Sequence, residues 1–88
     1  DFQLIDVREN YEYEFSNLDG LHIPLGVISN HLDEISREKK VVIHCKAGGR
    51  SAKAVALLQD RYAYQNLYNL TGGILAWKEE MNPALEVV

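Results

Sequence analysis

The stretch Val41-Val42-Ile43-His44-Cys45-Lys46-Ala47-Gly48-Gly49-Arg50-Ser51 contains the only cysteine of the 88-residue chain. Its β-branched run predicts a strand that is covered on both faces and leads directly into Cys45. Gly48 and Gly49 permit backbone angles that side chains forbid, so the N–H groups of the loop can turn inward. Such arrays bind anions, and a helix that begins at Ser51, with Ser51 as its N-cap, adds the positive end of its dipole. We therefore expect Cys45 to be a thiolate near neutral pH, which is the nucleophilic form of the side chain.

Strands and helices alternate on both sides of this stretch. Short apolar runs predict strands over residues 2–7, 21–23, 41–45 and 66–70. Helical spacing of apolar residues and end signals predict helices over residues 9–15, 27–35, 51–62 and 74–81. The alternation predicts an α/β fold with a parallel sheet, whose functional crevice lies beyond the carboxyl ends of the strands. Because the first strand ends in Asp6-Val7-Arg8, we expect Asp6 and Arg8 at the same edge as Cys45.

The composition is that of one small globular domain covering residues 1–88. The formal net charge is −4, from 9 Lys and Arg against 13 Asp and Glu, which disfavours a nucleic-acid partner. No apolar run approaches the ~20 residues of a membrane span, so we expect no membrane partner. A single cysteine cannot form an internal disulfide, so the fold needs no oxidising compartment, and we expect a cytoplasmic protein.

Five pieces of the chain together resemble the rhodanese-like family of sulfurtransferases. In chain order they are Leu4 to Glu9, Tyr11 to Glu14, Gly20 to Gly26, Cys45 to Ser51, and Leu70 to Trp77. The resemblance implies a three-layer α/β fold, with a central parallel sheet of four to five strands flanked by helices. It also implies a catalytic cysteine that carries sulfur as a persulfide.

The family's site residues carry over onto matching positions. Cys45 matches the sulfur-accepting nucleophile, and Asp6 and Arg8 match an acidic and basic pair near the site. The loop that surrounds the sulfur matches Lys46, Ala47, Gly48, Gly49 and Arg50, followed by Ser51. Family members usually carry a further strand and helix before the position of Asp1. We therefore expect either a domain excised from a longer chain without these elements, or a sheet with one strand fewer. The ending from Gly73 to Leu85 also resembles rhodanese domains fused behind adenylyltransferases that activate a sulfur-carrier protein in molybdopterin, thiamine or tRNA thiolation.

The chemistry so implied is sulfur transfer without a metal or organic cofactor. Cys45 would take sulfur from thiosulfate or from the persulfide of a cysteine desulfurase. It would pass this sulfur to a small thiol, to cyanide or to a sulfur-carrier protein. Lys46 and Arg50 can supply cations, and Arg50 could fork onto a sulfite leaving group. Asp6 and Arg8 share a strand face and most simply form a structural ion pair near the rim.

Two other functions compete with this interpretation. Cysteine phosphatases and arsenate reductases of related fold place an arginine after five intervening residues, whereas Arg50 follows Cys45 after four and Ser51 holds the phosphatase position. A non-catalytic binding module is the second alternative, because fold alone does not determine function. The histidines do not change this choice. His44 should point to the opposite face from Cys45, and His22 and His31 lack metal-ligand spacing.

Overall fold

A computed structural model describes all 88 residues. Four strands form the sheet: β1 (Phe2–Asp6), β2 (Leu21–His22), β3 (Lys40–His44) and β4 (Leu67–Asn69). Three α-helices accompany them: α1 (Asn10–Phe15), α2 (Gly49–Tyr62) and α3 (Gly73–Met81). Two short 3₁₀ helices, η1 (Leu25–Asn30) and η2 (Leu32–Glu34), connect β2 to β3. These bounds agree with the predicted strands and with three of the four predicted helices to within two residues.

The sheet is parallel throughout and has the strand order β2-β1-β3-β4. The central pair, β1 and β3, is joined along its whole length, from Phe2 opposite Lys40 to Asp6 opposite His44. The predicted α/β class with a parallel sheet is therefore confirmed. Because all four strands run the same way, the segments that follow Asp6 and His44 leave the sheet at one edge.

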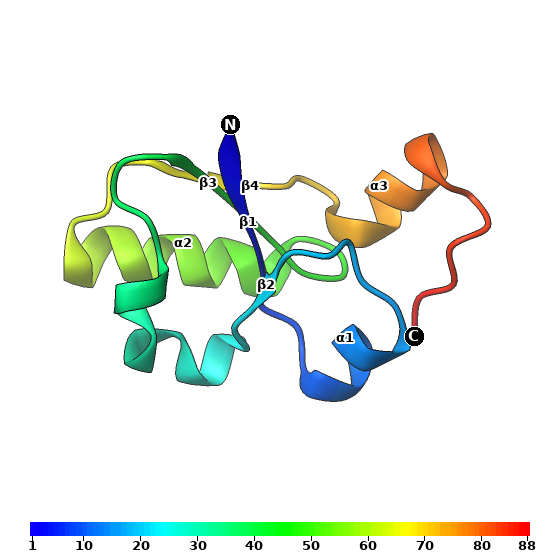
Figure 1. Cartoon of the computed structure of the whole chain (residues 1–88), viewed down its shortest axis with the longest axis horizontal. Coiled ribbons are helices and arrows are strands. Elements are labelled where there is room, and N and C mark those ends of the chain that lie inside the picture. Colours follow the sequence, from blue (N-terminus) through cyan, green and yellow to red (C-terminus); the bar gives the residue numbers. More distant parts are fainter.

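The hydrophobic core lies between one face of the sheet and α2. Ile5, Val41 and Ile43 on that face are fully buried, as are Ala54 and Leu58 on α2. Figure 1 shows α2, the longest helix, alongside β3 and β4, with α1 and α3 toward the other end of the molecule. The core thus anchors the two elements that flank Cys45, which are β3 before it and α2 after it.

The opposite face of the sheet is less completely covered. Side chains there include Phe2, which is 55% exposed, and Leu4 and Val42, which are half-buried. Trp77 of α3 lies against this face and lines a hollow of about 300 Å³ together with Phe2, Leu4, Leu18, Val42 and Leu70. The C-terminal segment then descends beside α1, where the Ser16 hydroxyl donates a hydrogen bond to the Glu86 carbonyl at 2.5 Å (Figure 1).

The predicted helix over residues 27–35 was wrong, because this segment forms η1 and η2 instead. The two 3₁₀ helices are interrupted at His31, whose φ and ψ are −127° and 28°. Pro24 precedes η1, and several residues of η1 are poor α-helix formers. These are Gly26, Val27, Ile28, Ser29 and Asn30. Ile28 and Ile35 are buried in the core and Leu25 and Leu32 pack against it, while Val27 is 39% exposed.

No helix of the chain combines the length and the apolar character that crossing a membrane requires.

Candidate functional site

Cys45 lies immediately after β3, at the start of a tight loop that leads into α2. Gly48 takes a φ of +113°, in the region that favours glycine, and acts as the N-cap of α2. The helix consequently begins at Gly49, and its first turn lies directly beside the cysteine. The N–H groups of Gly49 and Arg50 belong to that first turn and have no intrahelical acceptor.

The Cys45 sulfur accepts hydrogen bonds from the loop and the helix around it. The Gly48 N–H donates to Sγ at 3.1 Å and the Ser51 N–H at 3.4 Å, and the Ser51 hydroxyl oxygen lies 3.4 Å from the same sulfur. Burial, which leaves Cys45 only 1% exposed, raises the pKa of the thiol. The hydrogen bonds from Ser51 and from the loop N–H groups outweigh it, so the pKa is lowered from its ordinary value. The site is built to hold a negative charge on this sulfur.

Ser51 is not the N-cap of α2, contrary to the prediction. It is the third residue of the helix and is fully buried, because Gly48 starts the helix two residues earlier than expected. Its hydroxyl oxygen lies 2.6 Å from Asn69 Oδ1 and 3.2 Å from the Gly48 carbonyl. Ser51 therefore connects the cysteine to β4. Asn69, at the end of β4, was not singled out from the sequence.

Arg50 forms a two-pronged ion pair with Glu12 of α1. Its Nη1 and Nη2 atoms lie 2.6 and 2.9 Å from the two carboxylate oxygens. This hydrogen-bonded pairing, working against burial, lowers the pKa of Glu12 from 4.5 to about 2. It also raises the pKa of Arg50. The fork that was expected to bind an oxyanion is occupied by a carboxylate from the chain itself.

Glu12, like Asn69, lies near the site but was not singled out from the sequence. It also accepts a hydrogen bond from the Glu9 N–H at 2.9 Å, which completes a capping box at the start of α1. The capping-box spacing between Glu9 and Glu12 was the available signal for its place on α1. Its pairing with Arg50 had no local signal.

Lys46 and Ala47 form the outer part of the loop. Lys46 is half-buried and makes no ion pair, and Ala47 is exposed. Lys46 is therefore the cation of this loop whose charge no carboxylate compensates.

The N-terminus of α3 supports the loop from beneath. The Ile74 and Leu75 N–H groups donate to the carbonyls of Cys45 and Lys46 at 2.9 and 3.1 Å. Gly73 makes this approach possible, because its φ is +61° and a Cβ there would lie 2.6 Å from the Cys45 carbonyl oxygen. Gly73 thus brings α3 against the backbone of the reactive loop.

Asp6 and Arg8 form an ion pair, as expected, but in the interior and not at the rim. Arg8 Nε lies 3.0 Å from both carboxylate oxygens of Asp6, and Nη2 lies 2.7 Å from Oδ2. Both residues are fully buried, and Nη2 also donates to the Ser16 carbonyl at 2.8 Å. The pair fastens the end of β1 to the segment after α1.

His44 is also fully buried, and its side chain lies on the same face of the sheet as that of Asp6. Its Nε2 is 3.8 Å from Asp6 Oδ2, and neither ring nitrogen has a hydrogen-bond partner. Burial is the main cause that lowers its pKa, so the neutral ring is favoured. His22 bonds through Nε2 to the Arg8 carbonyl, and His31 pairs with Glu34. No group of three His, Cys, Asp or Glu side chains is placed to hold a metal ion.

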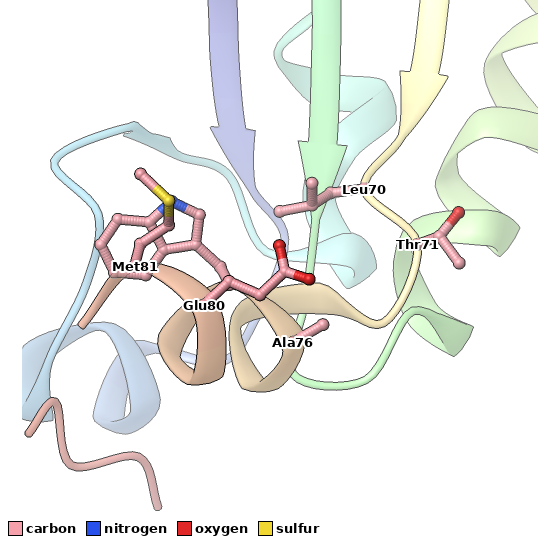
Figure 2. A pocket seen from close by; sticks show the side chains of 6 residues that line it. Leu70, Thr71, Ala76, Glu80 and Met81 are labelled. Carbon is pink, nitrogen blue, oxygen red and sulfur yellow. The ribbon is translucent and has the colours of Figure 1, made fainter. Parts of the chain in front are cut away.

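A second hollow of the molecule, of about 280 Å³, lies between the end of β4 and α3. Figure 2 shows Leu70 and Thr71, which follow the strand, across from Ala76, Glu80 and Met81 of the helix. Cys45 lines neither this hollow nor the apolar one beside Trp77. A reactant would therefore meet the cysteine at its loop and not within a deep pocket.

A strand-end cysteine enclosed by a glycine loop and a helix N-terminus, on a parallel sheet, defines a class of α/β proteins with an anion-holding thiol. Residues 1–80 match the family described as the rhodanese-like domain. Since this match spans most of the 88 residues, the chain belongs to the rhodanese-like family. The resemblance seen in the sequence is confirmed.

Individual relatives agree with this assignment. A sulfurtransferase of Allochromatium vinosum is 37% identical over 78 residues, covering 88% of this chain and 72% of that protein. The probable adenylyltransferase/sulfurtransferase MoeZ of Mycobacterium tuberculosis is 35% identical over 83 residues, covering 91% of this chain and 21% of that protein. The chain thus spans about a fifth of the length of this mycobacterial relative. The crystal structure of a rhodanese-related protein from Thermoplasma volcanium is 33% identical with a TM-score of 0.79, covering 99% of this chain and 83% of that one.

Proposed function

We propose that this domain is a sulfurtransferase in which Cys45 carries sulfur as a persulfide. The Cys45 thiolate attacks the outer sulfur of a donor such as thiosulfate. A new sulfur–sulfur bond forms, the sulfur–sulfur bond of thiosulfate breaks, and sulfite leaves with the electron pair. An acceptor nucleophile then attacks the outer sulfur of Cys45–S–S⁻ and releases the Cys45 thiolate. No metal or organic cofactor takes part in either step.

The observation that carries this proposal is the set of donors aimed at the Cys45 sulfur. Both the resting thiolate and the persulfide are anionic, so the reaction needs fixed hydrogen-bond donors more than a proton shuttle. The N–H groups of Gly48 and Ser51 already contact Sγ. The first-turn N–H groups of Gly49 and Arg50 are available for the outer sulfur. Membership of the rhodanese-like family supports the same chemistry.

The arrangement of Arg50 supports sulfur transfer over phosphate or arsenate chemistry. A phosphatase loop wraps a tetrahedral oxyanion with amides and a free guanidinium. Here the loop has one residue fewer than a phosphatase loop before its arginine. Both terminal nitrogens of Arg50 are hydrogen-bonded to the Glu12 carboxylate. The surroundings that lower the pKa of the Cys45 thiol also favour a catalytic role over a purely non-catalytic module.

For the donor and acceptor, we propose a sulfur relay between proteins. A cysteine desulfurase persulfide is the proposed biological donor, and thiosulfate is the convenient substitute. The mycobacterial relative joins adenylyltransferase and sulfurtransferase in its name. We therefore propose a sulfur-carrier protein as the acceptor, with a fused or partnered adenylyltransferase that activates it. Cyanide and small thiols serve as acceptors in the assay.

Intact-mass measurement tests the proposal directly. The reduced protein is incubated with thiosulfate, with Cys45→Ala as the control, and then with cyanide or dithiothreitol. We expect the wild type alone to gain one sulfur and to lose it again in the second step. The reversal excludes a sulfinic acid, which adds nearly the same mass but would remain. No gain from either thiosulfate or a desulfurase persulfide, or an equal gain on Cys45→Ala, would reject the persulfide mechanism.

A further inference from the structure

The Ser51 hydroxyl beside Cys45 has one proton and three nearby acceptors. These are Asn69 Oδ1 at 2.6 Å, the Gly48 carbonyl at 3.2 Å and Cys45 Sγ at 3.4 Å. A hydroxyl group can donate only one hydrogen bond at a time, and the distances favour Asn69. While Cys45 is a thiol, the hydroxyl therefore presents a lone pair, and not its proton, to the sulfur. The Ser51 hydrogen bond that lowers the pKa of Cys45 forms when the hydroxyl proton turns from Asn69 to the thiolate.

The orientation of the Asn69 amide follows from its second contact. Its Nδ2 lies 3.4 Å from the Gly48 carbonyl oxygen, where a donor is required. Turning the amide over would place Oδ1 against that carbonyl and leave two acceptors facing each other. Oδ1 therefore faces Ser51, and the amide holds both the hydroxyl proton and the backbone of the loop.

We infer that Asn69 is a positioning residue that competes with the Cys45 thiolate for the Ser51 hydroxyl proton. This inference rests on the proposed role of Cys45 as the sulfur-carrying nucleophile. It adds a residue that sets how readily Cys45 loses its proton. When Cys45 is a thiol, its S–H can donate to the Ser51 oxygen, while Ser51 donates to Asn69. When Cys45 is a thiolate, the Ser51 hydroxyl must break its hydrogen bond to Asn69 before it can donate one to the sulfur. Asn69 thus reduces the stabilisation that Ser51 gives to the anion.

Replacing Asn69 leaves the charged groups around the Cys45 sulfur unchanged. Lys46 lies in the loop, and Arg50 on α2 is paired with Glu12 of α1. Asp6, Arg8 and His44 are buried on the opposite face of the strands. Asn69 itself is uncharged and exposed, so its replacement by alanine changes no charge and removes little packing.

The test is the pH dependence of Cys45 alkylation by iodoacetamide, followed by intact mass. Because Cys45 is the only cysteine, the midpoint of the rate profile reports this thiol alone. We expect Asn69→Ala to lower the midpoint by about half to one pH unit, the equivalent of one hydrogen bond. In a Ser51→Ala background, Asn69→Ala should no longer shift the midpoint. Asn66→Ala is the matched control, since Asn66 also bonds backbone carbonyls, those of Ser36 and Lys39, but far from the sulfur.

An unchanged or raised midpoint in Asn69→Ala would overturn the inference. So would an equal downward shift in the Ser51→Ala background, because Asn69 would then act independently of the hydroxyl. If Asn69→Ala does not fold, Asn69→Leu replaces it, because leucine is uncharged and offers the hydroxyl no acceptor. The midpoint should again fall, and an unchanged or raised midpoint would reject the inference. The alkylation profile does not require sulfur transfer, so failure of the persulfide test and failure of this one are distinguishable.

Discussion

The guanidinium of Arg50 is joined to the carboxylate of Glu12 through two hydrogen bonds, although 38 residues separate them. This pair connects α1 to the first turn of the helix that flanks Cys45. Glu12 is nearly buried, with 5% of its side chain exposed, whereas Arg50 is 33% exposed. The pair therefore fixes α1 against the start of α2, beside the reactive loop. It also neutralises the positive charge of Arg50, which would otherwise attract an anionic reactant at Cys45.

Replacing Glu12 by glutamine should lower stability in a pH-dependent way. The pKa of Glu12 falls from 4.5 to about 2 in the folded state, chiefly through the Arg50 hydrogen bonds. A carboxyl group with a lowered folded pKa stabilises the fold above its unfolded pKa, and this contribution is lost as the pH falls from about 4.5 to about 2. We expect Glu12→Gln to lose about 2 kcal/mol at pH 7, allowing for the partial exposure of Arg50, and almost nothing near pH 2.

Urea unfolding of both proteins at a series of pH values measures this difference. Glu14→Gln is the control, because Glu14 is an exposed residue of the same helix without an ion pair. A loss that is constant across the pH range would show that the carboxylate charge of Glu12 contributes nothing to stability.

Gly73→Ala should separate α3 from the reactive loop. The φ of Gly73 is +61°, and an added Cβ would meet the backbone carbonyls of Cys45 and Lys46. We expect a loss of about 2 kcal/mol or more, with slower sulfur loading because the loop loses its support. Gly26→Ala is the matched control, since a Cβ there meets no atom within 4 Å. Equal stability of the two variants in thermal unfolding would contradict the assigned role of Gly73.

The parts of this site that could be predicted from the sequence are those with local signals. In this chain, a β-branched run, a cysteine at its end and two glycines were enough to predict the strand and the anion-holding loop. The exact start of α2 could not be predicted, because Ser51 is a good N-cap by type, and only the φ of Gly48 moves the helix two residues earlier. Long-range partners had no local signal either, so the positions of Glu12 against Arg50 and of Asn69 against Ser51 required the structure.

Asp6→Asn should destabilise the protein strongly, because it leaves the Arg8 guanidinium buried without a charged partner. Both side chains are at most 1% exposed. Breaking a buried pair from one side costs about 3–5 kcal/mol. Denaturant unfolding checks this, with Asp33→Asn as the control, because Asp33 is exposed and makes no ion pair. A small loss of stability combined with a large loss of sulfur transfer would instead assign Asp6 to the reaction.

Lys46→Ala should weaken the use of an anionic sulfur donor without harming the fold. Lys46 is the loop cation that no carboxylate pairs with, whereas Glu12 already compensates Arg50. A charge contribution of up to about 1 kcal/mol corresponds to a rise of roughly threefold to fivefold in KM for thiosulfate, with kcat nearly unchanged. The difference in KM between the wild type and Lys46→Ala should shrink at high ionic strength, since salt screens exposed charges.

Lys53→Ala is the control for this prediction. It removes an exposed cation further along α2 and should leave KM unchanged. If Lys53→Ala raises KM as much as Lys46→Ala does, the donor responds to overall charge and Lys46 has no specific part in binding it.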